Sequence, residues 1–240
     1  MPTPYQTAAI LIIGNEVLSG RTREANAWYA AKNLFEQGCK LGEVAIIPDL
    51  HDDIVMALQR LSDHYDVVIT SGGIGPTHDD ITMQAVADCF AVRLLEHAET
   101  MQKLYERFGQ DVDSGRRRMA RLPETSEPIV CSASLMPGAH IRNVYVLAGV
   151  PSIFASQLDS FLDRFGGRPF IRKEIDVSMA ESHFASALAD IQEQFNDVEI
   201  GSYPMMCADH PCGKICLSSQ HKNHLDDAFE AVQTMIQGFL

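Results

Sequence analysis

The residues best suited to chemistry lie between positions 66 and 83, in the run DVVITSGGIGPTHDDITM. Its apolar start predicts a strand buried on both faces, and this strand ends in a glycine-rich loop. Glycine tolerates positive φ and lets a ligand approach backbone N–H groups, which is how such loops hold phosphate. The candidate binding residues of this loop are Ser71, Gly72, Gly73, Gly75, Pro76 and Thr77.

Two carboxylates follow the glycine loop directly. Asp79 and Asp80 precede apolar residues that recur every four positions, so the pattern predicts a helix with both acids in its first turn. A polyphosphate could rest on the loop N–H groups, but the carboxylates would repel it unless a divalent cation lay between them. The stretch therefore predicts a metal–phosphate site. The structural alternative is a tight turn capped by Asp, because the G-G-x-G spacing matches neither common glycine motif.

Glycine and acidic residues also follow three other predicted strands, at positions 7–13, 43–47 and 144–148. The residues just past these strands are Gly14, Glu16, Asp49, Gly149 and Pro151. Ligands of open α/β sheets bind outside the carboxyl ends of the strands, so we expect these residues and the Asp79/Asp80 pair at one rim of a sheet. The alternative is that each acid only caps the helix that follows it.

The periodicity of the chain predicts an α/β fold in two domains. Up to about position 165, buried strands alternate with amphipathic helices, which calls for right-handed crossovers and a mostly parallel sheet. A Gly-Gly-Arg-Pro run separates a domain at 1–166 from one at 169–240. The second domain reads as β-α-β-β-α, a small α+β unit. Within it, an irregular segment that could reach the site follows Gly201, Ser202 and Tyr203.

The composition narrows the choice of partners and compartment. A net charge of −13 argues against nucleic acid or an anionic membrane as the main partner. No apolar run reaches transmembrane length and the start of the sequence lacks a basic signal, so we expect a cytoplasmic protein.

The cysteines do not suggest a disulfide framework, because several lie inside apolar periodic segments where reduced core cysteines are expected. Cys207, His210, Cys212 and Cys216 could be read as a zinc site. The absence of a C-x-x-C pair argues against that reading.

Two further features have both a plain and a functional interpretation. The triplet Arg116-Arg117-Arg118 is most simply a solvated surface, although it could face an anionic ligand or partner. His78 is placed to act as an acid or base, although a single exposed histidine is often incidental.

The run SGGIGPTHDDIT resembles the glycine-rich signature of the molybdopterin-binding-like (molybdenum cofactor biosynthesis) domain. Four other runs extend the resemblance over almost the whole chain: NEVLSG at 15–20, PD at 48–49, NVYVLAGVP at 143–151 and GSYP at 201–204. Together they are similar to the branch that contains the N-terminal domains of competence/damage-inducible protein A and of eukaryotic FAD synthase. The resemblance implies a three-layer α/β/α sandwich. No amidohydrolase or synthetase domain of these families is found in the 240 residues, so neither downstream activity can be assigned.

The resemblance also implies an activity, the hydrolysis of a dinucleotide pyrophosphate such as ADP-ribose or FAD with Mg²⁺, Mn²⁺ or Co²⁺. Residue by residue, it implies that Gly72, Gly73, Gly75 and Thr77 hold phosphate, that Asp80 and Thr82 form the D-x-T signature, and that Asp49 is the acid after the second strand. Asp49 and Asp80 would hold the metal, with Asp79 or Glu16 orienting a water. Related domains assemble, so we expect a dimer or trimer. The alternative is a module that binds a pterin or nucleotide without turnover.

Overall fold

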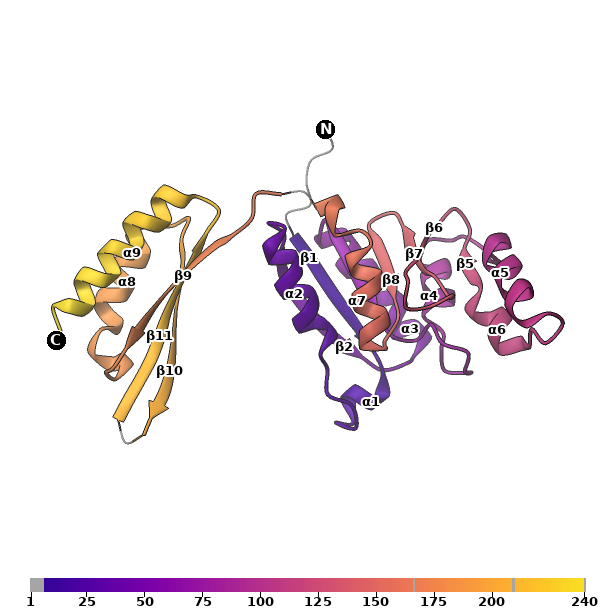
Figure 1. Cartoon of the computed structure of the whole chain (residues 1–240), viewed down its shortest axis with the longest axis horizontal. Helices are drawn as coiled ribbons and strands as arrows, with labels where there is room; N and C mark the ends of the chain where they lie inside the picture. The colour runs from indigo at the N-terminus through magenta and orange to yellow at the C-terminus, as the bar shows by residue number, and fades with distance from the viewer. Residues whose placement is uncertain (1–6, 166, 209, 240) are drawn as a thin grey trace. The chain divides into compact units, whose positions relative to one another are not determined.

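The computed structural model describes residues 7–165, 167–208 and 210–239. The chain divides into two compact units, with the division between Gly167 and Arg168 (Figure 1). Within the described ranges, no helix combines the length and the hydropathy that crossing a bilayer requires.

The first unit is built on a six-stranded sheet with the strand order β2-β1-β3-β8-β7-β6. β2, β1, β3 and β8 run parallel, whereas β7 runs antiparallel to both of its neighbours. This mostly parallel sheet confirms the predicted α/β fold, although the sequence did not predict β6 and β7. The strands are β1 (Thr7–Ile13), β2 (Lys40–Ile47), β3 (Val67–Ser71), β6 (Glu127–Ile129), β7 (Gly138–Ile141) and β8 (Val144–Leu147).

Helices cover both faces of this sheet and make the three layers that the family resemblance implied. Alternate residues of β1 point to opposite faces, so Leu11 belongs to the same core as Leu58 of α3, while Ile10 belongs to the same core as Phe154 of α7. α3 and α4 cover one face and α2 and α7 the other. The elements are α1 (Asn15–Leu18), α2 (Asn26–Glu36), α3 (His51–His64), α4 (Thr82–Cys89), α7 (Pro151–Asp159) and the 3₁₀ helix η1 (Leu162–Phe165).

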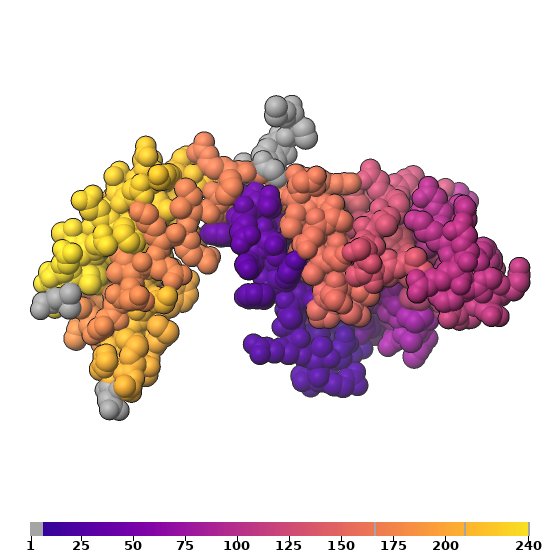
Figure 2. All heavy atoms as spheres, viewed as in Figure 1, coloured from indigo at the N-terminus to yellow at the C-terminus, as the bar shows by residue number. Residues whose placement is uncertain are grey.

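α2 and α7 lie side by side on their face of the sheet, α2 in indigo and α7 in orange in the space-filling view (Figure 2). The Tyr29 hydroxyl of α2 donates a hydrogen bond to Asp159 Oδ1 of α7 over 2.9 Å. The apolar inner faces of these two helices therefore share one core, with a polar contact at the surface.

In the sequence, a smaller group of helices and strands follows α4 and precedes β6. A two-stranded antiparallel pair of β4 and β5 accompanies two helices. The longer helix ends at a glycine, Gly109, which has φ 59°. The elements are β4 (Leu94–Glu96), α5 (Ala98–Phe108), α6 (Ser114–Met119) and β5 (Arg121–Pro123).

The second unit is a three-stranded antiparallel sheet, ordered β10-β11-β9, and its helices pack on a core of their own. The prediction of an irregular segment after Tyr203 is wrong. β10 continues to Cys207 and pairs with β11 up to the pair of Cys207 and His210. The elements are β9 (Ile171–Val177), η2 (Glu181–His183), α8 (Ala185–Gln194), β10 (Glu199–Cys207), β11 (His210–Ser219) and α9 (Lys222–Gln237).

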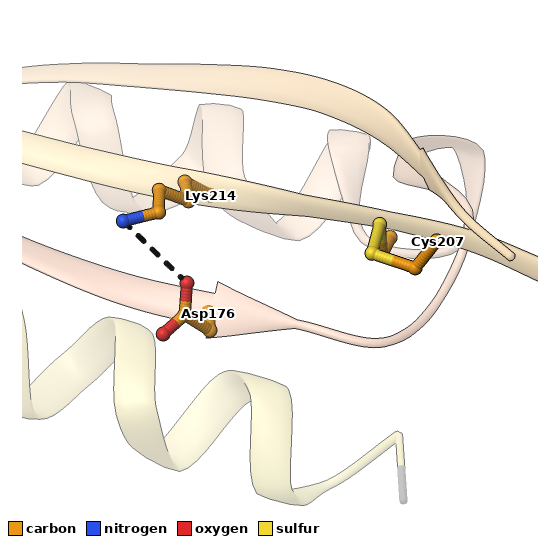
Figure 3. Close-up of a disulfide and its surroundings, with 4 residues drawn as sticks. Asp176, Cys207 and Lys214 are labelled. Carbon is orange, nitrogen blue, oxygen red and sulfur yellow. Dashed lines mark ion pairs between the residues drawn. A yellow bond between two sulfur atoms is a disulfide. The ribbon is translucent and has the colours of Figure 1, made fainter.

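The pairing of β10 and β11 also corrects the expectation for the cysteines. Cys212 lies opposite Met205, so Cys207 is its diagonal neighbour, and a disulfide joins the two sulfurs (Figure 3). Lys214, further along β11, forms an ion pair with Asp176 over 3.7 Å. Cys216 is a free thiol. Among the described residues no group of three or more His, Cys, Asp or Glu could hold a metal ion, so the zinc alternative finds no support there.

Candidate functional site

The loops after β1 and β3 begin at the same rim of the sheet. The Gly14 N–H donates to the Ile47 carbonyl and the Gly72 N–H donates to the Leu147 carbonyl, each over 3.2 Å. Gly72 has φ 108°, and a Cβ at this position would lie 2.1 Å from the carbonyl oxygen of Ile13. Only glycine fits there, because any other side chain would collide with the end of β1.

Asn26, at the start of α2, fastens a third loop to this rim. The side chain is 7% exposed, and its Nδ2 donates to Ser71 Oγ and to the Gly149 carbonyl, each over 2.8 Å. A Cβ on Gly149 would lie 3.2 Å from the Cα of Gly72, so the two loops touch. The predicted convergence of Gly14, Gly72 and Gly149 at one rim is therefore confirmed. Pro151 opens α7, as expected.

Asn26 was missed by the sequence reasoning. A polar residue that opens an apolar helix is usually a cap, and nothing local indicates that its partners lie in two distant loops.

Thr82 fixes the return of the glycine loop into α4. Its buried hydroxyl donates to the Gly72 carbonyl and its N–H donates to the Gly73 carbonyl, each over 2.9 Å. Gly73 has φ 67°, and a Cβ there would lie 2.2 Å from Thr82 Oγ1. The Thr of the D-x-T signature thus shapes the loop through two of its carbonyls, while the N–H groups of Gly72 and Thr77 bond to the end of β8 and to Asp80.

Asp80 holds the middle of the glycine loop. Its Oδ2 accepts the Thr77 N–H over 2.8 Å and the Thr77 hydroxyl over 2.5 Å. A Cβ on Gly75 would lie 2.6 Å from the same oxygen, so the loop wraps closely around this carboxylate. The expectation that Asp79 and Asp80 lie in the first turn of α4 is wrong, because the helix begins at Thr82. The physical reason is the turn that Asp80 makes with Thr77, which competes with helical backbone bonding.

The other two acids of the site meet at the ends of β1 and β2. Asp49 Oδ2 accepts the Asn15 N–H over 2.8 Å, which ties the loop after β2 to the loop after β1. The Glu16 carboxylate folds over Gly14, where a Cβ would lie 2.7 Å from Glu16 Oε1. Asp49 is therefore at the rim, as predicted, and it also stabilises the short helix α1.

The remaining candidates are His78 and three residues of the second unit. The His78 side chain is 95% exposed, and its Nδ1 lies 4.0 Å from Asp79 Oδ1. Gly201, Ser202 and Tyr203 lie on β10 in the second unit, paired with β11. Their part in the site stays a prediction.

One further side chain reaches the glycine loop. Arg118 of α6 donates from Nη1 to the Thr77 carbonyl over 2.5 Å. The sequence offered the arginine triplet as a candidate surface without distinguishing its members. The structure singles out the third.

The chain was compared with known protein families, curated proteins and solved structures. The model for the probable molybdopterin binding domain matches residues 9–173, and that for the FAD synthase middle domain matches residues 169–239. A relative from Caenorhabditis elegans, a probable FAD synthase, is 28% identical over 98% of this chain, and this chain spans about half of it, 51%. Protein TK1472 from Thermococcus kodakarensis is 33% identical, and the match covers 82% of this chain and 85% of that protein.

A solved structure supports the same assignment. The crystal structure of the protein CinA, of unknown function, from Thermoplasma acidophilum is 27% identical to this chain, with a TM-score of 0.63. The similarity covers 68% of this chain and 99% of the other. A family match over more than half of the chain, together with the glycine loop and rim described above, shows that the chain belongs to the probable molybdopterin binding domain family.

Proposed function

We propose that the chain is a metal-dependent pyrophosphatase that cleaves a dinucleotide such as ADP-ribose or FAD. The observation that carries the proposal is the convergence at one rim of a glycine loop and of carboxylates from two separate loops, Asp49 and Asp80. The similarity to a protein named probable FAD synthase supports a nucleotide with a pyrophosphate bridge as the ligand.

The glycine loop would bind the phosphates through its backbone. Its shape is held by three contacts, namely Gly72 N–H to the end of β8, Thr82 to two loop carbonyls, and Asp80 to Thr77. A loop fixed in this way needs little reordering when an anion binds, which favours affinity.

The carboxylates fit a metal that is bound together with the substrate. Asp49 and Asp80 each use Oδ2 for a backbone N–H, and within the described residues neither Oδ1 accepts a hydrogen bond. No cage of three or more protein ligands is formed in that part of the chain. Mg²⁺ is usually held by one or two carboxylates plus substrate phosphates and water, so this donor set suits Mg²⁺, Mn²⁺ or Co²⁺.

When bound, the ion would polarise the bridging phosphate and lower the pKa of a water. Asp79 or Glu16 would accept a proton from the attacking water as a general base. Interactions with helix ends or single N–H groups are worth about 0.3 to 2 kcal/mol, whereas enzymes lower barriers by about 8 to 23 kcal/mol. The backbone cradle therefore cannot account for the rate without the carboxylates and their ion.

The second candidate is a module that binds a pterin or a nucleotide without turnover. The family description favours it, because it names molybdopterin binding and no reaction. Such a module needs the glycine loop, and it needs the carboxylates only as braces of the loops and not as metal ligands. The two candidates therefore differ in what Asp80 does.

The test is phosphorus NMR of ADP-ribose and FAD incubated with the protein and Mg²⁺, Mn²⁺ or Co²⁺, with and without a chelator. We expect two phosphomonoester products, which disappear when the metal is removed. Asp80→Asn should lower kcat/KM by about 100-fold or more, because the amide is a poor ligand for a hard cation. The variant should unfold within about 1 kcal/mol of the parent, because its carbonyl oxygen can still accept from Thr77.

Asp63→Asn, an exposed acid on α3, is the matched control and should leave the rate unchanged. Hydrolysis at the parental rate by Asp80→Asn would show that Asp80 stabilises the loop and does not hold a catalytic metal. Binding of these ligands by the parent without any product would favour the second candidate.

A further inference from the structure

The three neighbouring arginines of α6 differ in what they contact. Arg116 forms an ion pair with Asp113, the residue that caps the helix. Arg117 lies 3.3 Å from Glu96 and donates to the Tyr105 hydroxyl over 2.6 Å. The charges of these two arginines are therefore already used in holding α6 to its surroundings.

Arg118 has no such carboxylate partner among the described residues. Its Nη1 donates to the Thr77 carbonyl, and the side chain is otherwise exposed. The helix itself is docked on the loop, because a Cβ on Gly115 would lie 3.2 Å from Cβ of Pro76. The position of the guanidinium therefore follows from the packing of α6 against the glycine loop.

The charge of the site makes this guanidinium significant. The chain carries a net charge of −13, and Asp79 and Asp80 follow the loop directly. Within the described ranges, Arg118 supplies the one guanidinium or ammonium group that hydrogen-bonds to residues 71–80. A pyrophosphate approaching the loop would meet several carboxylates and this single fixed cation.

We propose that Arg118 binds a phosphoryl oxygen of the ligand held by the glycine loop, and so selects ligands that carry a pyrophosphate over the uncharged nucleoside or flavin. The inference rests on the proposed function for the class of ligand. A guanidinium has five N–H donors, and the Thr77 carbonyl takes one of them. Its planar fork suits the oxygens of a phosphate, and the contact would strengthen when water is excluded.

Arg118 and Asp80 bond to different groups of Thr77. The N–H and hydroxyl of Thr77 go to the Asp80 carboxylate, while its carbonyl accepts from Arg118. One residue of the loop is thus bonded to both an anionic and a cationic side chain. A plain bracing role for Arg118 is the competing explanation, and the test must separate bracing from ligand binding.

The test measures the affinity of ADP-ribose and of inorganic pyrophosphate by calorimetry with Mg²⁺ present, at about 50 and about 300 mM KCl. Arg118→Gln keeps an N–H donor for the Thr77 carbonyl but removes the charge, and Arg118→Lys keeps the charge. We expect Arg118→Gln to bind both probes about tenfold more weakly and with less salt dependence, and Arg118→Lys to recover part of the loss. Arg117→Gln is the matched control and should stay within about twofold of the parent.

Parental affinity in Arg118→Gln would overturn the proposal, as would an equal loss of affinity for adenosine, which has no phosphate. Failure of the parent to bind either phosphate probe would overturn it as well. Binding by the parent without hydrolysis would count against the pyrophosphatase proposal alone, because the affinity ratios of the variants would still decide the role of Arg118.

Discussion

At the scale of single residues, the site is held together by short polar side chains that serve the backbone. Thr82, Asp80 and Asn26 each hydrogen-bond to main-chain groups of a loop at the rim. The sequence predicted the positions of Gly72 and Asp49, because a residue that ends a parallel strand must lie at the carboxyl rim. It could not predict the partners of Asn26, because they depend on how three loops meet in space.

Asn26→Ala should destabilise the first unit by about 2 to 3 kcal/mol, because it leaves the Gly149 carbonyl and the Ser71 hydroxyl without their buried donor. Urea unfolding followed by circular dichroism measures the change. Asn33→Ala on the same helix removes one part-buried bond to the Tyr29 carbonyl, and should cost about 1 kcal/mol or less. Equal losses in the two variants would show that Asn26 is an ordinary helix residue.

At the scale of elements, long periodic segments were predictable and short ones were not. The helices α2 and α3 follow from apolar residues on one face of each. β6 and β7 have only three and four residues, and the pairing of Glu127 with His140 exists because β8 provides an edge for β7. The start of α4 was misplaced because Asp80 bonds to Thr77 and not to the helix.

A histidine connects α3 with α4 and makes their contact dependent on pH. His51 Nδ1 lies 3.0 Å from Asp52 Oδ1, and Nε2 lies 2.8 Å from Asp88 Oδ2 at the end of α4. The hydrogen bonds to Asp52 and then to Asp88 raise the pKa of His51 above its ordinary value. The folded state therefore favours the charged ring. The resulting stability is fully present below the ordinary pKa, about 6.5, and is lost as the pH rises through the folded value.

His51→Gln should thus destabilise the protein by less than about 1 kcal/mol near pH 5.5, since the ring is partly exposed, and by still less near pH 8.5. Urea unfolding at both pH values tests the difference, and the ring protons of His51 in NMR should report a pKa above about 6.5. Asp88→Asn should lower that pKa. If the unfolding free energy of His51→Gln depends on pH as it does in the parent, other groups cause the pH dependence.

At the scale of the whole molecule, two compact units share one chain, and the first presents an exposed sheet edge. β2 is an outer strand of the sheet, and its Val44 and Ile46 are 47% and 40% exposed. An apolar outer strand is a surface on which a second copy can pack. This observation adds to the expectation of a dimer or trimer.

Light scattering at micromolar protein should therefore give a mass of two or three times 26.5 kDa. Val44→Lys combined with Ile46→Lys should shift the mass toward that of one chain, because charge on an edge strand opposes pairing. A parent that scatters as a single chain would contradict the expectation. A variant that keeps the parental mass would place the interface on another surface.

The central pairing of β3 with β8 has a consequence for how fast the protein folds. Val68 pairs with Val144, so forming the middle of the sheet closes a long loop of chain. The neighbouring hairpin of β7 and β8 joins residues close in sequence, Ile141 with Val144, and can form early. Non-local parallel pairing slows folding, because the entropy of closing the loop is lost before the contact forms. We therefore expect the hairpin of β7 and β8 to form first, and the pairing of β3 with β8 to form in the transition state of folding.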